Sequence, residues 1–284
     1  PSSQPALSPS FSPTSTPMKT SPPTSAPTCS PTSGPYVFTS KASLHSAVDL
    51  WDNDEASALS IYGDISTWDT SQITDFNSLF ASKVNFNEDI GDWNTSMVVD
   101  MTNLFNMAVS FNRDISRWDT RNVILFRGTF ANADAFNHDI SAWDTQSATN
   151  MESMFSGADV FNQPIGHWDV SNVLDMRDMF SQTAMFNQDL SNWRTESLLY
   201  TSRMFYFAIA FNGDISGWDL SHVNDFTSMF ARAVSFNQPL GTWYTSAVRT
   251  MELMFNSAAA FDQDVSAWPM ITATNLDMMF MDAY

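Results

Sequence analysis

Residues 161–185 read FNQPIGHWDVSNVLDMRDMFSQTAM, one copy of a unit that recurs every 25 residues from Ile61 onward. Nine copies follow one another without an insertion, and one tryptophan column and two phenylalanine columns recur in phase. A fixed period of this length is the mark of a stacked array, in which equivalent side chains lie over one another. The tryptophan column is Trp68, Trp93, Trp118, Trp143, Trp168, Trp193, Trp218, Trp243 and Trp268. The phenylalanine columns are Phe80, Phe105, Phe130, Phe155, Phe180, Phe205, Phe230, Phe255 and Phe280, and Phe86, Phe111, Phe136, Phe161, Phe186, Phe211, Phe236 and Phe261.

The quoted copy predicts two elements per coil. Residues 161–168 are aromatic-rich and run into turn residues, which is typical of a short strand. Residues 173–180 place Val, Met and Phe at helical spacing, which predicts a short amphipathic helix with Ser171 or Asn172 at its N-cap. The fold class predicted is therefore an α/β repeat solenoid, leucine-rich-repeat-like, with nine coils that each hold one short strand and one short helix.

Two segments precede the repeats of 61–284. Residues 36–60 predict an N-terminal helical cap in which Ser40 starts a helix and Leu44 and Val48 lie on its apolar face. Residues 1–35 are rich in Pro, Ser and Thr and cannot bury a core, so they predict an extended tail. The tail resembles an O-glycosylated stalk, with a plain flexible linker as the alternative. Its candidate acceptors are Ser8, Thr14, Thr16, Thr24, Thr28 and Thr32.

Composition narrows the possible partners. Hydrophobic residues make up 43% of the chain, enough for a large core, and the formal net charge is −19. An acidic chain is disfavoured as a partner of nucleic acid or of anionic membranes. No apolar run is long enough to span a bilayer. Cys29 is the single cysteine, so it excludes an internal disulfide and a Cys-based zinc site, and it can form a disulfide only with another chain.

Several phrases carry a family resemblance. FNRDISRWDT (111–120), FNGDISGWDLSHVNDFTSMF (211–230) and the sequence of 161–190 resemble the BspA-type leucine-rich-repeat surface proteins, whose unit also occurs in mycoplasma-type surface lipoproteins. The resemblance covers 61–284, and residues 44–69 are similar to the lead-in of algal and protist members. It implies an extracellular or cell-surface protein linked to adhesion and to binding host or matrix components.

Three residues depart from the repeated pattern. Thr129 stands where Leu or Met is usual, Thr201 replaces a Met or Phe, and Pro269 follows the last tryptophan. These coils are expected to be locally irregular.

An asparagine follows the first phenylalanine of most units. Side-chain amides stacked in this way can donate and accept along the array and satisfy turn backbones. We interpret the column as structural, and the preceding Phe argues that it is not exposed to a ligand. The column is Asn87, Asn112, Asn137, Asn162, Asn187, Asn212 and Asn237.

Two aspartate columns raise the question of metal binding. Like charges one coil apart repel, so either Asx turns or bound Ca²⁺ must compensate them. We favour Asx turns, because no stretch matches a known calcium loop. The calcium alternative falls on Asp64, Asp89, Asp114, Asp139, Asp189, Asp214 and Asp264, and the second column is Asp69, Asp119, Asp144, Asp169 and Asp219.

Catalysis is not expected, and no other cofactor is implied. The four histidines fall at unrelated phases of the repeat, no glycine-rich phosphate loop is present, and Cys29 lies in the tail. Met151 and Met154 are expected to fill the core. The one N-glycosylation sequon is Asn94-Thr95-Ser96.

The last residues suggest an assembly face. Met278, Met279, Phe280, Met281 and Tyr284 are expected to present an apolar surface on which another coil stacks, which would build a head-to-tail fibre or sheath. The alternative is a monomeric cell-surface module that binds glycan or protein through the solenoid surface. A third interpretation is a fragment of a longer cell-wall protein.

Overall fold

The computed structural model describes residues 34–283, and from Gly34 onward they form one compact unit. Most of the predicted tail therefore lies outside the described residues. So do Cys29, Tyr284 and the O-glycosylation candidates Ser8, Thr14, Thr16, Thr24, Thr28 and Thr32.

Helix α1 (Lys41–Asn53) begins directly after Ser40, the residue expected to cap it. The Ser40 hydroxyl accepts a hydrogen bond from the Ser43 N–H at 3.2 Å, which satisfies one of the N–H groups that the first helical turn leaves unpaired. The face toward the coils buries Leu44, Ala47, Val48 and Trp51.

Helix α2 (Glu55–Tyr62) follows after one residue. Asp54 ends α1 and caps α2, because its carboxylate accepts from the Ser57 N–H at 3.1 Å. Gly63 ends α2 with a positive φ of 76°, and the 3-10 turn η1 (Ile65–Thr67) leads into the first coil. In residues 34–283 no helix is both long and apolar enough to cross a membrane.

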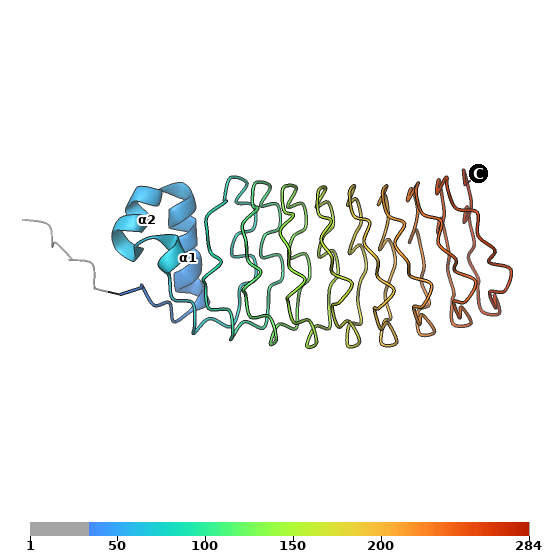
Figure 1. Ribbon diagram of the computed structural model, residues 1–284, viewed down its shortest axis with the longest axis horizontal. Coiled ribbons are helices and arrows are strands. Elements are labelled where there is room, and N and C mark those ends of the chain that lie inside the picture. Colours follow the sequence, from blue (N-terminus) through green and yellow to red (C-terminus); the bar gives the residue numbers. More distant parts are fainter. Residues whose placement is uncertain (1–33, 284) are drawn as a thin grey trace, which may run out of the picture. The chain divides into compact units, whose positions relative to one another are not determined.

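Ion pairs join α1 to the first coil, beside which it lies (Figure 1). Lys41 Nζ lies 2.9 Å from Asp75 Oδ1, and Lys83 Nζ lies 2.7 Å from Asp49 Oδ1. The Lys83 side chain is only 9% exposed. Burial raises the pKa of Asp49, but Lys83 and then His45 outweigh burial, so that the net pKa is lowered. The cap is thus held by both apolar and charged contacts.

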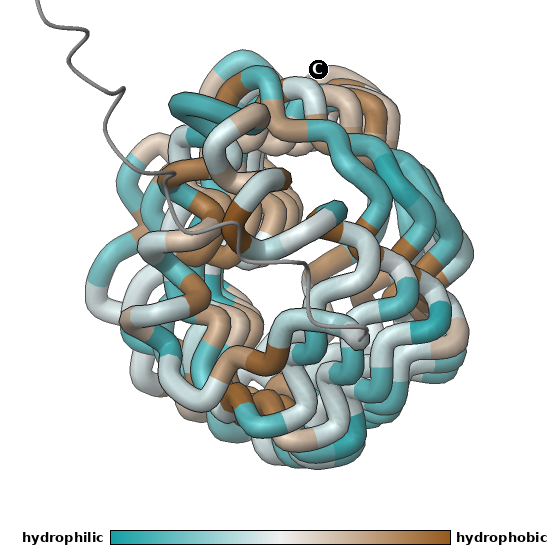
Figure 2. Tube along the Cα trace, turned by 90° about the vertical axis from the view of Figure 1, so that its left-hand side faces the viewer, coloured by the Kyte–Doolittle hydropathy of each residue, from teal (hydrophilic) through white to brown (hydrophobic). Residues whose placement is uncertain are grey.

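The repeats form a row of coils, one for each 25 residues (Figure 1). Viewed along the row, each coil lies behind the one before it, and hydrophobic positions recur in register (Figure 2). Neighbouring coils pair through isolated parallel bridges at one position of the repeat. The bridged pairs are Asp75–Asp100, Asp100–Leu125, Leu125–Asn150, Asn150–Asp175, Asp175–Tyr200, Asp225–Thr250 and Thr250–Asn275.

The predicted strand and helix of each coil are absent in the described residues. Residues 161–168 are neither strand nor helix, and the segment 173–180 is a bridge residue followed by consecutive turns. The physical reason is the competition for backbone N–H groups. An α-helix uses its N–H groups within itself, whereas these segments share them with the neighbouring coil.

The second coil shows how the turn segment divides its hydrogen bonds. Alternate N–H groups donate to carbonyls of the next coil, and the groups between them donate to carbonyls three residues earlier in the same coil. The first set is Met101 to Leu125, Asn103 to Arg127, Phe105 to Thr129 and Met107 to Ala131, at 2.7–2.9 Å. The second set is Leu104 to Met101, Asn106 to Asn103 and Ala108 to Phe105, at 3.0–3.1 Å. Every one of these N–H groups is paired, as buried backbone requires.

This division requires left-handed residues. In the fifth coil Asp178 has φ 54° and Gln182 has φ 61°, and the same two positions are left-handed throughout the row. Left-handed φ costs a non-glycine residue roughly 1–2 kcal/mol, which the bonds to the next coil offset. Consecutive turns also repeat about every three residues, so the buried side chains of Val173, Met176 and Met179 have a spacing close to that of a helix.

Aromatic ladders fill the interior. The phenylalanine column from Phe80 to Phe280 is continuous, with centroids of successive rings 5.2–5.8 Å apart. The Phe86 column stacks at 5.8–6.1 Å. Tryptophans lie in register beside them, as with Trp143 and Trp168 at 6.5 Å. From Trp93 onward each indole N–H donates to a carbonyl of the preceding coil.

Two of the three departures alter the hydrogen bonding locally. Thr129 is buried and its hydroxyl donates to the carbonyls of Met101 and Phe126. The hydroxyl of Thr201 donates to the Asp225 carbonyl at 3.2 Å, at the coil boundary where the bridge between Tyr200 and its equivalent is missing. Threonine thus supplies from its side chain part of what the backbone supplies elsewhere.

Candidate binding groove

The asparagine column is a hydrogen-bonded ladder. Each side-chain oxygen accepts from the backbone N–H of the equivalent residue one coil later, as from Asn112 to Asn87 at 2.9 Å. The same contact recurs at Asn137, Asn162, Asn187, Asn212, Asn237 and Asp262. The column is nevertheless half-buried to exposed. The expectation that the preceding Phe would shield it is wrong, because the Phe side chain points inward while Asn remains at the rim.

The aspartates of the calcium alternative lie at corners of the coils. Asp64, Asp89, Asp114, Asp139, Asp189, Asp214 and Asp264 each accept a hydrogen bond from the N–H two residues ahead. Asp69, Asp119, Asp144, Asp169 and Asp219 make the same Asx turn at the next corner. Backbone and hydroxyl hydrogen bonds from Ser141 lower the pKa of Asp139, and Ser191 does so for Asp189. Within residues 34–283 no three His, Cys, Asp or Glu side chains are arranged to hold a metal ion.

The remaining predicted residues lie on different parts of the row. Met151 and Met154 are fully buried. Of the expected assembly face, Met278, Phe280 and Met281 are exposed. Met279 is only 6% exposed, so its assignment to that face is wrong. Its N–H bonds back to Leu276, which turns its side chain into the coil.

The sequon residue Asn94 is exposed at a corner of the second coil. Its side-chain oxygen accepts from the Ser96 N–H at 3.1 Å and from the Ser96 hydroxyl at 2.7 Å. Asn94 therefore takes the place of Asp in the Asx turn of its column.

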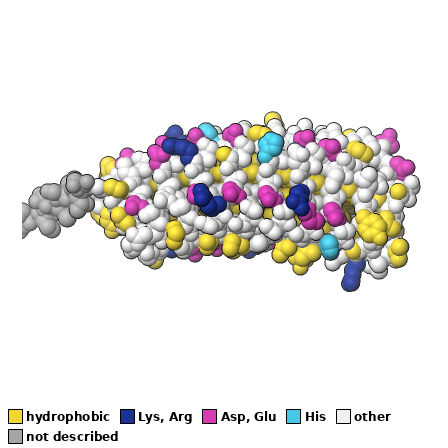
Figure 3. All heavy atoms as spheres, turned by 60° about the horizontal axis from the view of Figure 1, so that its bottom comes forward, with side chains coloured by type: hydrophobic (Ala, Val, Ile, Leu, Met, Phe, Trp, Pro, Cys, Tyr) yellow, Lys and Arg dark blue, Asp and Glu magenta, His cyan; other side chains and the backbone are white. Residues whose placement is uncertain are grey.

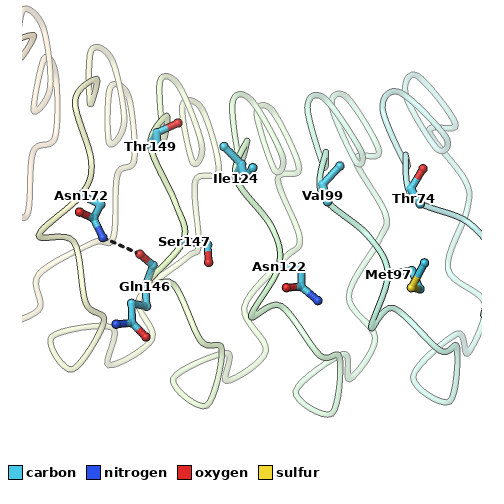
Figure 4. A pocket seen from close by; sticks show the side chains of 9 residues that line it. All are labelled: Thr74, Met97, Val99, Asn122, Ile124, Gln146, Ser147, Thr149 and Asn172. Atoms are coloured by element: carbon cyan, nitrogen blue, oxygen red, sulfur yellow. Dashed lines mark hydrogen bonds between the residues drawn. The ribbon is translucent and has the colours of Figure 1, made fainter.

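A groove crosses five successive coils (61–185) on one long side of the row. It has a volume of about 740 Å³, within the range of ligand-binding clefts. Figure 4 shows two rows of side chains along it, one mostly aliphatic and the other mostly polar. We call it the amide groove; it is lined by Thr74, Met97, Val99, Asn122, Ile124, Gln146, Ser147, Thr149 and Asn172.

Local backbone geometry creates both rows. In residues 122–124 the side chains alternate, with Asn122 and Ile124 exposed on either side of the buried Val123. Alternation of this kind belongs to extended chain, and it places two outward columns side by side in every coil. The groove escaped sequence analysis because the signal is only three residues long and its outward positions differ from copy to copy.

The groove carries no charged side chain, although the chain has a formal net charge of −19. Farther along the row, charge appears in these columns with Glu196 and Arg249. Figure 3 shows acidic and basic side chains in a line along a long face, with hydrophobic side chains gathered in a strip beside them. The uncharged surface is therefore limited to the first five coils.

The polar row is anchored to the preceding coil. Asn122 Nδ2 donates to the Ser96 carbonyl at 2.8 Å, and Asn172 Nδ2 donates to the Gln146 carbonyl at 2.9 Å (Figure 4 shows the second bond). Each amide keeps its oxygen and a second N–H hydrogen for other partners. The side chains are thus oriented by the protein while part of their hydrogen-bonding capacity stays open.

Fold and groove together define a repeat protein whose stacked coils present a continuous uncharged surface. A protein-family profile described as "Mycoplasma protein of unknown function, DUF285" matches residues 51–160, 139–233 and 192–284. The chain belongs to this family. No curated protein matches the chain, and neither does any solved structure. The narrower resemblance to BspA-type proteins stays a prediction.

Proposed function

We propose that this chain is an extracellular or cell-surface repeat protein that acts by binding, not by catalysis, through the long side of its coils. The row is interpreted as a leucine-rich-repeat-like solenoid, in which turn segments replace the helix. The observation that carries the proposal is the amide groove, whose outward side chains take little part in the repeated ladders. Family membership supports a repeat protein, and the predicted glycosylated tail supports an extracellular location.

The division of labour between columns supports a binding role. Buried columns such as the one containing Phe155 are identical in all nine copies, whereas outward columns contain Thr, Val, Ile, Leu, Asn and Arg in turn. A scaffold that holds its core constant and varies one surface is suited to recognition.

The location is tested on intact cells. An antibody raised against residues 34–284 should label the outer surface of unpermeabilised cells, and purified protein should cosediment with isolated extracellular material. Labelling that appears only after permeabilisation, with no cosedimentation, would overturn the proposal.

Head-to-tail assembly is a second candidate, favoured by the face of the ninth coil. Met278 is 60% exposed and Phe280 is 45% exposed there. That face suits one further coil, whether from the same chain or from a second copy. At the other end of the row α1 and α2 cover the first coil, so a second copy would have to dock through its helices.

Analytical ultracentrifugation over a range of concentrations tests assembly. Growing oligomers that Phe280→Asp abolishes would support it. A monomer at every concentration would contradict it.

A further inference from the structure

We infer that the amide groove binds a neutral, extended polysaccharide that runs along the row with about one sugar ring per coil. The inference rests on the proposed binding function and specifies its ligand class. Five coils contribute equivalent positions to the groove, so a ligand with its own regular repeat can make similar contacts in each coil.

Charge selects among such ligands. The groove has no charged lining residue, and the protein around it is strongly acidic. Sulfated or uronic chains would be repelled by the field of the whole protein, and a cationic chain would find no carboxylate in the groove. A neutral chain meets neither obstacle.

The lining chemistry fits sugar hydroxyls. Amide and hydroxyl groups both donate and accept, as sugar hydroxyls do, and Asn122 and Asn172 are already oriented by their bonds to the preceding coil. Val99 is 40% and Ile124 is 42% exposed on the opposite row. These aliphatic side chains can contact the C–H faces of the sugar rings.

An extended peptide fits less well. The backbone beneath the aliphatic row is engaged in the array, because Val99 N–H donates to Thr74, Ile124 N–H to Val99 and Thr149 N–H to Ile124. A peptide could not add as another strand by main-chain pairing there. A polyproline peptide requires aromatic ridges, and no lining residue of the groove is aromatic.

The test is calorimetric titration of the full chain with linear gluco- and manno-oligosaccharides of increasing length. Affinity for at least one series should rise with length and level off near five sugars, one for each coil of the groove. A carboxylated derivative of the same series should bind about tenfold more weakly or less.

Matched variants locate the site. Ile124→Asp should weaken binding by about tenfold or more, while Leu199→Asp, at the same position of a coil outside the groove, should change it by less than about twofold. Circular dichroism should show both variants folded. Ser147→Ala, which removes one hydroxyl and adds no charge, should weaken binding by a smaller factor and serves if Ile124→Asp fails to fold.

Three outcomes would overturn the inference: no neutral series bound, equal binding of the carboxylated chain, or binding indifferent to both Ile124→Asp and Ser147→Ala. Competition by an uncharged Ser/Thr-rich peptide with the same variant dependence would identify a peptide ligand instead. If the protein still labels the cell surface in any of these cases, the binding function stands and only the ligand class fails.

Discussion

Truncation of one ring in the middle of the phenylalanine column should destabilise the protein far more than the same change at its end. Phe155 is fully buried, with Phe130 5.6 Å and Phe180 5.8 Å away in the column and Phe161 at 3.9 Å. Phe155→Ala removes the transfer free energy of the ring and leaves a cavity that stacked coils cannot close, so the expected loss is about 3–5 kcal/mol.

The matched control is Phe280→Ala. Phe280 is 45% exposed and stacks on only one ring of its column, Phe255 at 5.5 Å. Removal of a half-buried ring should cost about 1–2 kcal/mol. The difference between the two variants should therefore be about 2 kcal/mol or more.

Urea denaturation followed by tryptophan fluorescence and far-ultraviolet circular dichroism measures both losses. Because each coil contacts mainly its neighbours, Phe155→Ala should also separate the two halves of the row and broaden the transition. Equal losses for the two variants, or a loss below about 1 kcal/mol at Phe155, would refute the continuous column as the main source of stability.

Three further predictions concern charged groups. Lys83→Met should lower the free energy of unfolding by about 1–2 kcal/mol, because it leaves carboxylates of α1 unpaired beside the first coil, whereas Lys41→Met, at a more exposed pair, should cost less than about 1 kcal/mol; urea denaturation of each variant decides. Stability should be constant above the ordinary carboxyl range and fall as pH drops through the lowered pKa values of the Asx-turn aspartates, and Asp139→Asn should keep the turn while removing its share of that dependence; a pH series that shows no acid loss contradicts this. Burial and the charge of Asp159 raise the pKa of Asp134, so Asp134→Asn should stabilise the protein by a few tenths of a kcal/mol at neutral pH, with the gain shrinking as acid protonates the wild-type carboxyl; a destabilised variant would rule this out.

The register of the row was predictable from sequence, whereas the backbone within each coil was not. A period of 25 residues with invariant Trp and Phe specifies which side chains meet, because stacking leaves no other arrangement for them. The spacing of Val173, Met176 and Met179 is shared by a helix and by consecutive turns. Only the N–H groups given to the next coil, a long-range contact, separate the two.

The candidate site was beyond sequence analysis for a related reason. The groove depends on outward residues such as Met97, Asn122 and Thr149, which have no common residue type and lie 25 or more residues apart. The repeated pattern directs attention to columns that are alike, and these are structural. In the second outward column, Ile124 and Arg249 occupy the same position with opposite chemistry.

The alternating hydrogen bonds of the turn segment make the coils interchangeable. Each coil offers the same donors to its successor and the same acceptors to its predecessor, in one direction only. Excision of residues 161–185 would bring two coils together that already match, whereas a cut of any other length would misalign every ladder at once. A gene that encodes such a protein can gain or lose whole coils by recombination, and with them the length of the surface on offer, while each junction is ready-made.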